Sequence, residues 1–177
     1  MTNKLQKILK EYAEAVIQDA RSNLASRQSS GKLLNSLSYK LKERGVDFFM
    51  EDYGVFINEG VRGADHDYAE SKKSEYHYKK VAQPFRKGAN VVPPTNVFDK
   101  WIVRKGIAPR DEKGRFISRQ SLKFAIARGI YKKGIRATMF FTKPFEKNIS
   151  KYEGKIAEAY IEDKFKNNHK YSITIIE

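Results

Sequence analysis

Apolar residues recur every three or four positions through the first 25 residues, and this spacing places them on one face of an α-helix. The repeat runs through Leu5, Leu9, Tyr12 and Val16. The pattern therefore predicts an amphipathic helix over residues 3–25, which ends at a run of small and polar residues.

After a short turn of helix at residues 32–36, the period of the pattern changes to two. Apolar and polar residues alternate over residues 37–42, and residues 46–50 form a second apolar segment. Arg44-Gly45 lies between these segments. We expect an antiparallel hairpin that turns there.

Two stretches without a helical pattern follow. Residues 53–57 are a short apolar segment that Gly60 terminates, and we expect a strand or a turn there. Residues 61–92 show no hydrophobic periodicity and carry many charges. A connection of this length is either functional or disordered. We expect it to be disordered in the free subunit and to become ordered on assembly.

The next segment predicts two helices around a small hairpin. Thr95 begins the first helix, and Gly106 lies past its end, where a left-handed conformation favours glycine. Phe98, Trp101 and Ile102 form its apolar stripe, so Trp101 should be buried. Beyond it the pattern predicts a hairpin at residues 110–117, a helix over residues 119–133 that Ser118 caps, and an apolar face made by Leu122, Ala125, Ile126 and Ile130.

A last helix follows a predicted short strand at residues 138–141. Pro144 suits the first turn of this helix, where a missing N–H group costs nothing. Residues 171–176 alternate and are rich in β-branched residues, which predicts a final strand. The apolar face of the last helix should pack against the first helix, and it consists of Phe145, Ile149, Tyr152, Ile156 and Tyr160.

These elements predict an α+β fold in which long N-terminal and C-terminal helices pack on a small, mostly antiparallel sheet. Residues 1–60 and 137–177 would form one domain. Residues 61–136 would be a basic insertion with a long loop, two short helices and a hairpin. A hydrophobic content of 40% and an aromatic content of 12% support a packed core.

The positive charge of the chain is concentrated in this insertion. Of the net charge of +14, residues 61–136 contribute +12, from 19 Lys/Arg against 7 Asp/Glu. A concentrated positive field attracts phosphate groups or acidic protein surfaces. A solvated loop face that keeps the protein soluble would have the same composition, so both interpretations stay open.

Acidic residues and histidines could mark a metal or nuclease site, but their spacing does not favour one. Asp65-His66-Asp67 and His77 lie in one loop, without the fixed spacing of a metalloprotease motif. Asp47 and Glu51 share one face of a strand, with no lysine at the spacing of a magnesium-dependent nuclease. A polar loop and a charged outer face of the hairpin explain these residues as well.

Other kinds of catalytic site are also not indicated. The sequence lacks a nucleophile elbow and a phosphate-binding loop. It contains no cysteine, which excludes disulfides, zinc–thiolate sites and cysteine nucleophiles. We therefore expect no catalytic residue, no metal site and no cofactor, and a protein that is not an enzyme.

Nucleic-acid binding is a stronger alternative. The segment from Lys72 to Lys80 interleaves basic and aromatic residues, which bind phosphates and stack on bases, respectively. The two helices of the insertion could also imitate a helix-turn-helix element, although a long connection separates them. The alternative function is thus a DNA-binding protein that uses residues 61–136. Its candidate DNA-facing residues are Arg119, Lys123, Arg128, Lys132 and Lys133.

Three further segments carry a resemblance by their order and spacing. GKLLNSLS at residues 31–38 follows the long first helix, YGVFINEG at residues 53–60 ends in an acid–glycine pair, and KPFEKNI at residues 143–149 enters the last helix. In this order they resemble the head–tail connector, or tail-completion (neck), proteins of tailed bacteriophages. Residues 115–135 are also similar to relatives from phages of gut bacteria. The chain departs from the family in residues 61–136, which are longer and more basic than is usual there.

The resemblance implies a virion structural protein that forms a closed homo-oligomeric ring and joins the portal–adaptor stack to the tail. The portal, adaptor and tail proteins would be its partners, and DNA in the ring lumen a further one. No membrane and no small-molecule substrate would be involved. It would be located in the virion, and in the cytoplasm of the bacterial host during assembly, in keeping with an N-terminus that lacks a secretory leader.

Assembly of such a ring suggests two kinds of contact. Closed rings hide strand edges by pairing them between subunits, and the predicted strand at residues 171–176 could pair in this way. The loop at residues 61–92 and the hairpin at residues 110–117 should reach outward. The candidate interface residues there are Arg62, Lys72, Lys73, Lys79, Lys80, Arg86, Arg110, Lys113 and Arg115.

Overall fold

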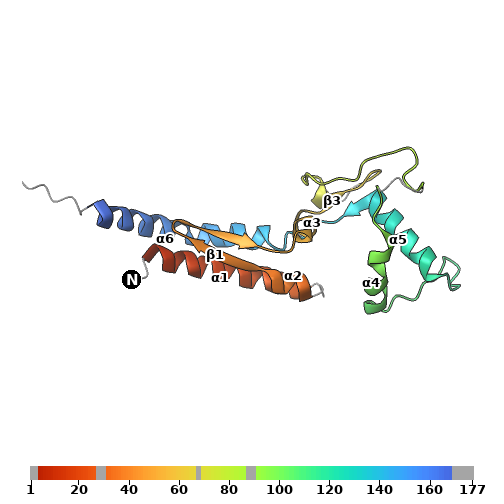
Figure 1. Cartoon of the computed structure of the whole chain (residues 1–177), viewed down its shortest axis with the longest axis horizontal. Helices are drawn as coiled ribbons and strands as arrows, with labels where there is room; N and C mark the ends of the chain where they lie inside the picture. Colours follow the sequence, from red (N-terminus) through yellow and green to blue (C-terminus); the bar gives the residue numbers. More distant parts are fainter. Residues whose placement is uncertain (1–3, 27–30, 67–68, 87–90, 169–177) are drawn as a thin grey trace, which may run out of the picture. The chain divides into compact units, whose positions relative to one another are not determined.

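The computed structural model describes residues 4–26, 31–66, 69–86 and 91–168 of the 177-residue chain. The fold is α+β, as expected, with long helices near both ends of the chain packed on a small antiparallel sheet (Figure 1). The chain divides into two compact units. Met1–Gly54 and Met139–Glu177 form one, called here the core unit, and Val55–Thr138 forms the other, called the basic unit. The boundaries thus lie a few residues from the expected positions at 60/61 and 136/137.

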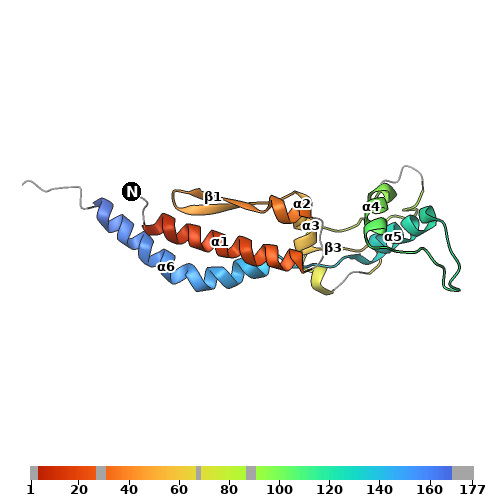
Figure 2. The same ribbon diagram turned by 90° about the horizontal axis from the view of Figure 1, so that it is seen from below.

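Two antiparallel helices, α1 (Lys4–Ala25) and α6 (Thr142–Asn168), form the frame of the core unit. They lie side by side in both views (Figures 1 and 2). At one end, Lys4 Nζ is 2.7 Å from a Glu162 carboxylate oxygen. At the other end, Lys147 Nζ is 3.0 Å from a carboxylate oxygen of Asp19. These exposed ion pairs lie at the two ends of the antiparallel pair, while buried apolar residues supply the packing.

The predicted apolar face of α1 is confirmed. Leu5, Leu9, Tyr12 and Val16 are all buried. The Tyr12 ring lies about 6 Å, centre to centre, from the rings of three residues on the hairpin and on α6, which are Phe48, Phe145 and Tyr152. Burial also raises the pKa of Tyr12 to about 12, because the surrounding apolar rings disfavour the phenolate.

The predicted face of α6 is confirmed in part, because Phe145 and Tyr152 contact Tyr12 and Ile156 packs beside Leu9, but the most deeply buried positions lie to one side of it. Phe145 and Tyr160 are each 38% exposed, whereas Asn148 is 3% exposed and Ala159 fully buried. Short side chains at these positions let α6 approach α1 closely. The Asn148 Nδ2 group also donates to Asp19 Oδ2 at 3.1 Å and to the Pro144 carbonyl at 2.9 Å. The pattern missed the burial of residues 148 and 159 because it counted large apolar residues, and a hydrogen-bonded asparagine and an alanine occupy these positions.

A short helix and a hairpin complete the core unit. The helix α2 (Gly31–Ser36) and the strands β1 (Ser38–Lys42) and β2 (Gly45–Phe49) were predicted nearly at their observed bounds. Ser38 pairs with Phe49 and Lys42 with Gly45, so the turn is Glu43-Arg44 rather than Arg44-Gly45. The hairpin packs on α1, where Gln6 Nε2 donates to the Lys42 and Glu43 carbonyls at 2.7 and 2.8 Å.

The segment expected to be a strand or a turn at residues 53–57 is a helix, α3 (Tyr53–Glu59). Gly54 and Asn58, four residues apart, are buried, which is a helical rather than an alternating period. Gly54 lies against Leu33, whose Cδ1 would be 2.9 Å from a Cβ at this position. Gly60, with φ of +76°, ends the helix. A five-residue apolar segment fits both periods, so its sequence could not separate them.

Two short strands join the ends of the basic unit. β3 (Val61–Arg62) pairs antiparallel with β4 (Gly134–Ile135). The strand predicted at residues 138–141 is wrong, because residues 138 and 139 belong to no regular element and residues 140 and 141 form a turn. Thr138 instead donates its N–H to the carbonyls of Ile57 and Asn58, both at 3.1 Å. Those carbonyls belong to the last turn of α3, where intrahelical partners are missing.

The rest of the basic unit contains two 3₁₀ turns, η1 (Ala69–Ser71) and η2 (Thr95–Phe98), and the helices α4 (Asp99–Arg104) and α5 (Arg119–Lys133). The bounds of α5 match the prediction, and the Ser121 N–H donates to the predicted cap, Ser118 Oγ, at 3.0 Å. Its deepest side chains are Ala127 and Tyr131, at 2% exposure, rather than the four predicted. The hairpin predicted at residues 110–117 is also present, with an antiparallel β-bridge between the backbones of Arg110 and Phe116.

The predicted burial of Trp101 is wrong, because this side chain is 38% exposed while Ile102 is 2% exposed. Phe98 ends a 3₁₀ turn and Trp101 lies in an α-helix. A 3₁₀ turn advances by three residues and an α-helix by 3.6, so one stripe does not continue across their boundary. The final strand predicted at residues 171–176 lies outside the described residues.

Leu9→Ala should lower the free energy of unfolding by about 2–5 kcal/mol, because it leaves a cavity beside Ala159 and the half-buried Ile156. Ile161 lies on α6 and is 53% exposed, so Ile161→Ala should change stability by less than about 0.5 kcal/mol. Urea unfolding of both variants compares the two. Equal losses would contradict the observed α1–α6 interface.

Gly134→Ala should destabilise the basic unit by about 1–3 kcal/mol or more, because Gly134 has φ of +86° and a Cβ there would overlap the Val61 carbonyl. Gly129, in the middle of α5, has open space around its Cβ position. Gly129→Ala should raise stability by about 0.5–1 kcal/mol. Thermal unfolding of the pair tests this, and a tolerated alanine at residue 134 would contradict the close contact of β3 with β4.

Candidate interaction surface of the basic unit

Tyr131 on α5 organises the surface of the basic unit. Its hydroxyl donates to the Lys79 carbonyl at 3.0 Å and accepts from the Val81 N–H at 3.4 Å. Its ring lies 5.9 Å from the Tyr78 ring and 5.7 Å from the Phe85 ring, centre to centre. Burial raises the pKa of Tyr78. Tyr131 therefore holds residues 78–85 along α5.

The last turn of α5 binds a second part of the same loop. The N–H groups of Asp65 and His66 both donate to the Lys132 carbonyl, at 3.2 and 2.9 Å, and Ala64 donates to the Tyr131 carbonyl at 2.9 Å. These bonds satisfy helix-end carbonyls that would otherwise lack partners. The described parts of residues 61–92 thus make defined contacts, in contrast to the disorder expected for this segment.

The fold brings together cations that lie about 50 residues apart in the sequence. Lys80 and Lys132 both approach the Asp65 carboxylate, with closest N–O distances of 3.9 and 3.4 Å. The Arg128 guanidinium lies 5.4 Å from the centre of the Phe85 ring. We call Lys79, Lys80, Arg86, Arg128 and Lys132 the loop–helix cluster. Its members come from both groups of candidates that the sequence suggested, one for protein interfaces and one for DNA.

The cations of the hairpin form a separate group with mainly local contacts. Arg110 lies over the Phe116 ring at 3.9 Å and donates to the Gly114 carbonyl at 2.7 Å. Arg115 Nε donates to Asp111 Oδ2 at 2.8 Å. Hydrogen bonds from the backbone and side chain of Arg115 lower the pKa of the Asp111 carboxyl. Lys113 is exposed at the turn, and Phe116 is 70% exposed, so the hairpin displays an aromatic ring backed by a guanidinium.

Lys123 differs from the other candidates because it holds the fold together. Its Nζ is 2.9 Å from Asp99 Oδ2, and 14% of its side chain is exposed. This ion pair ties α5 to the start of α4. Lys123 is therefore a poor candidate for a DNA-facing residue, while Arg119 and Lys133, at the two ends of α5, are exposed.

The remaining candidates lie on and after β3. Arg62 bonds through its backbone to the Tyr76 carbonyl and the Tyr78 N–H, at 2.9 and 3.0 Å. Its buried Nε atom has no hydrogen-bond partner among the residues that the structure describes. Lys72 and Lys73 follow η1 and are exposed.

The geometry does not form a helix-turn-helix element. That motif joins its helices by a turn of about three or four residues. Here residues 105–118 separate α4 from α5, and they contain the hairpin. The basic unit therefore presents cations on a loop and a helix, without a recognition helix set for the major groove.

The acidic residues that could have marked a metal or nuclease site have cationic partners. Asp47 lies 2.7 Å from Lys42 Nζ, and Glu51 lies 3.0 Å from Lys32 Nζ. Within residues 4–26, 31–66, 69–86 and 91–168, no cluster of three His, Asp or Glu side chains could hold a metal ion. In the same ranges, no helix combines the length and apolar character needed to cross a membrane.

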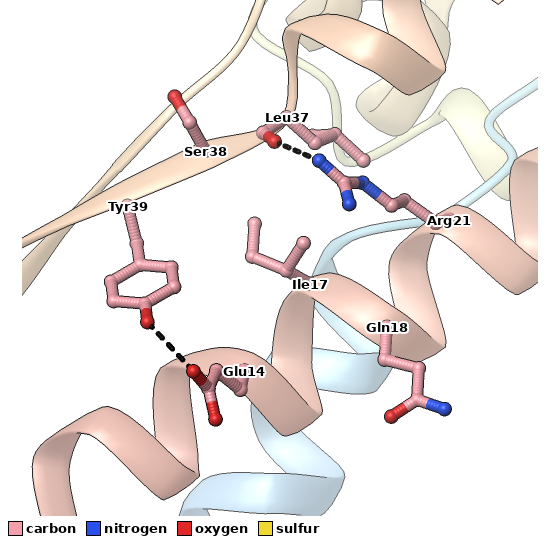
Figure 3. A pocket seen from close by; sticks show the side chains of 7 residues that line it. All are labelled: Glu14, Ile17, Gln18, Arg21, Leu37, Ser38 and Tyr39. Carbon is pink, nitrogen blue, oxygen red and sulfur yellow. Dashed lines mark hydrogen bonds between the residues drawn. The ribbon is translucent and has the colours of Figure 1, made fainter.

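Two open cavities of about 400 Å³ lie on the core unit. One lies between α1 and β1, and its lining includes Ile17 and Leu37 (Figure 3). The other lies between α1 and α6, beside Asp19 and Lys147. Neither is lined by a histidine.

Comparison with protein-family models, with curated proteins and with solved structures gives no match to this chain.

Two features of the surface were missed from the sequence. The anchoring role of Tyr131 depends on backbone groups about 50 residues earlier, which no local pattern indicates. The close backbone contacts at Gly63 and Gly134 were also missed, because their glycines resemble ordinary loop and helix-end residues. A tyrosine in the last turn of a predicted basic helix was the only sequence signal for the first feature.

Tyr131→Phe should lower the free energy of unfolding by about 1–2 kcal/mol, because it removes two hydrogen bonds while the ring contacts remain. Amide hydrogen exchange at Val81 should become faster. Tyr78→Phe is the control, since the Tyr78 hydroxyl makes no hydrogen bond within the described part of the chain. Similar exchange rates in both variants would show that Tyr131 does not anchor the loop.

Proposed function

We propose that this chain is a virion structural protein of a tailed bacteriophage, in the head–tail connector or tail-completion (neck) ring. Copies of the chain would form a closed ring between the portal–adaptor stack and the tail. The protein would act by assembly and not by catalysis. It would be located in the virion, and in the host cytoplasm while particles assemble.

The observation that supports this most is the place of the three resembling segments in the fold. GKLLNSLS supplies α2 and the start of β1, with Leu33 and Leu37 at 1% and 0% exposure. YGVFINEG forms α3 and the glycine that ends it, and KPFEKNI forms the first turns of α6. Each segment begins or ends an element of the fold. The order and spacing that carry the resemblance are therefore those of the structural framework.

A direct contact links the first two of these segments. Within the core unit, Gly54 of the second segment packs against Leu33 of the first. Within the basic unit, Thr138, which lies outside the three segments, bonds to the Ile57 and Asn58 carbonyls at the end of the second. A contact between the first two segments is expected if they share one structural role.

The basic unit suits contact with acidic protein neighbours or with DNA in a ring lumen. It carries 19 Lys/Arg against 8 Asp/Glu, a net charge of +11. The carboxylates of Asp65, Asp99 and Asp111 are used in internal ion pairs. The excess cations are exposed, and opposite charge on a neighbour would select and orient it.

A test must separate assembly from folding. Deleting residues 64–90 would not do so, because it would remove the bonds to the last turn of α5 and the rings that pack on Tyr131. Reversing exposed charges keeps those contacts. The test set makes no ion pair within the described residues, and it is Lys72→Glu, Lys73→Glu, Lys79→Glu and Arg86→Glu.

In the phage that encodes this chain, the four reversals should lower the yield of infectious particles by about tenfold or more. Electron microscopy should show DNA-filled heads and separate tails, while circular dichroism of the purified variant stays unchanged. The matched control reverses four exposed cations of the core unit, which are Lys7→Glu, Lys40→Glu, Lys143→Glu and Lys164→Glu.

Complete loss of the chain should give the same unjoined heads and tails. Normal particles without the chain would overturn the proposed function. A small dimer that binds one DNA sequence with salt-sensitive affinity would instead identify the DNA-binding alternative.

A further inference from the structure

A groove runs between α1 and the outer edge of β1 in the core unit. It encloses about 400 Å³ and is open to solvent. Ile17, at 6% exposure, and the buried Leu37 lie at its floor. Figure 3 shows a hydrogen bond on either side of Ile17. Arg21 Nη2 donates to the Leu37 carbonyl at 2.8 Å, and the Tyr39 hydroxyl donates to Glu14 Oε1 at 3.2 Å.

One wall of this groove is a strand edge with free backbone groups. Lys42 and Gly45 flank a two-residue turn, so they form the hydrogen-bonded pair nearest to it. Because such pairs alternate in antiparallel strands, Ser38, Lys40 and Lys42 face β2, and the N–H and C=O groups of Tyr39 and Leu41 face outward. No other residue that the structure describes bonds to these outward groups. The edge can therefore accept one more strand.

The sequence of the chain contains a segment suited to this edge. In residues 171–176, Tyr171, Ile173 and Ile175 alternate with Ser172 and Thr174. An extended strand turns alternate side chains to opposite faces, so the three large residues would face the groove floor. Glu177 follows the segment, and an antiparallel strand would place it at the Arg21 end of the groove.

We propose that residues 171–176 of one copy of the chain add as a strand to the β1 edge of a second copy. This inference rests on the proposed ring and names the contact between its subunits. Strand addition supplies affinity through backbone hydrogen bonds and specificity through alternate side chains. Each copy gives one segment and accepts one. Such a head-to-tail contact closes into a ring when the rotation between copies is a simple fraction of a full turn.

The geometry of the core unit prevents a copy from filling its own groove. Lys4 pairs with Glu158 and Glu162, so the end of α6 lies beyond the start of α1. At 1.5 Å per helical residue, Asn168 lies about 30 Å from the groove at Ile17, measured along the two helices. Ile173 follows five residues later and can reach about 18 Å at full extension. Ile173 of the same copy therefore cannot reach the groove floor at Ile17, so the residue that fills it comes from another copy.

Cysteine cross-linking tests this contact directly, because the chain has no cysteine of its own. Gln18 lines the groove, so copies carrying Gln18→Cys are mixed with copies carrying Ile173→Cys or Ile175→Cys and oxidised mildly. At least one mixture should give a disulfide-linked dimer, since a disulfide needs Cα atoms about 4.4–6.8 Å apart. A full-length chain with both cysteines should give a ladder of linked copies.

The matched control for the groove is Lys40→Cys, on the same strand with its side chain on the opposite face of the hairpin. It should give no dimer above the background from mixing wild-type chains. Equal cross-linking from residues 18 and 40, or none from residue 18, would overturn the proposal.

A second pair of variants tests the segment. The double variant Ile173→Asp, Ile175→Asp should raise the protein concentration at which half of the chains are assembled by about tenfold or more, because charges would enter an apolar groove. The double variant Ser172→Asp, Thr174→Asp adds the same negative charge on the other face of the proposed strand and should leave assembly nearly unchanged. Equal effects of the two pairs would contradict the alternating contact.

These outcomes separate this inference from the proposed function. Rings of the wild-type chain, together with no cross-link in the cysteine mixtures, would reject the strand contact alone. A cross-link in a protein whose loss leaves heads joined to tails would reject the connector function and keep the strand contact.

Discussion

The antiparallel packing of α1 on α6 is the contact on which the rest of the core unit depends. It joins segments that lie more than 100 residues apart in the chain, so the loop it closes carries a substantial entropy cost. The cost is offset by a continuous apolar seam through Leu5, Leu9 and Tyr12, and by ion pairs at both ends of the helices. The hairpin then covers this seam, since Leu41 and Val46 pack on the cluster that contains Leu5 and Leu9.

The basic unit uses its few carboxylates for structure. Asp99 ties α5 to α4, Asp111 holds the hairpin, and Asp65 neutralises part of the loop–helix cluster. Each pair consumes one of the scarce negative charges, so the excess of Lys and Arg is left at the surface. Repulsion among those cations opposes folding. A polyanionic neighbour would relieve it, which is a physical reason for such a unit to be stabilised in an assembly.

Long periodic segments could be predicted from the sequence, and short or contact-dependent features could not. α1 was predicted near its observed bounds because its pattern extends over enough residues to identify one period, and α5 and the hairpin because capping and turn residues mark their ends. Residues 53–57 were too few for that, and Trp101 lies just past a change from 3₁₀ to α geometry. At the surface, composition identified the candidate cations. Which of them are paired depends on acidic residues such as Asp65 and Asp99, whose neighbours only the fold determines.

The two units of the chain offer two physically different kinds of contact. In the core unit, the groove beside β1 offers backbone hydrogen bonds and an apolar floor, which are short-ranged and depend on close fit. In the basic unit, exposed lysines and arginines act over about 8–10 Å and weaken with salt. Contacts between identical copies need the first kind, because like-charged surfaces repel each other. Contacts with an acidic neighbour or with DNA can use the second. In the proposed assembly, a chain with one strongly basic unit and one nearly neutral unit would bind copies of itself through the neutral unit and different partners through the basic one.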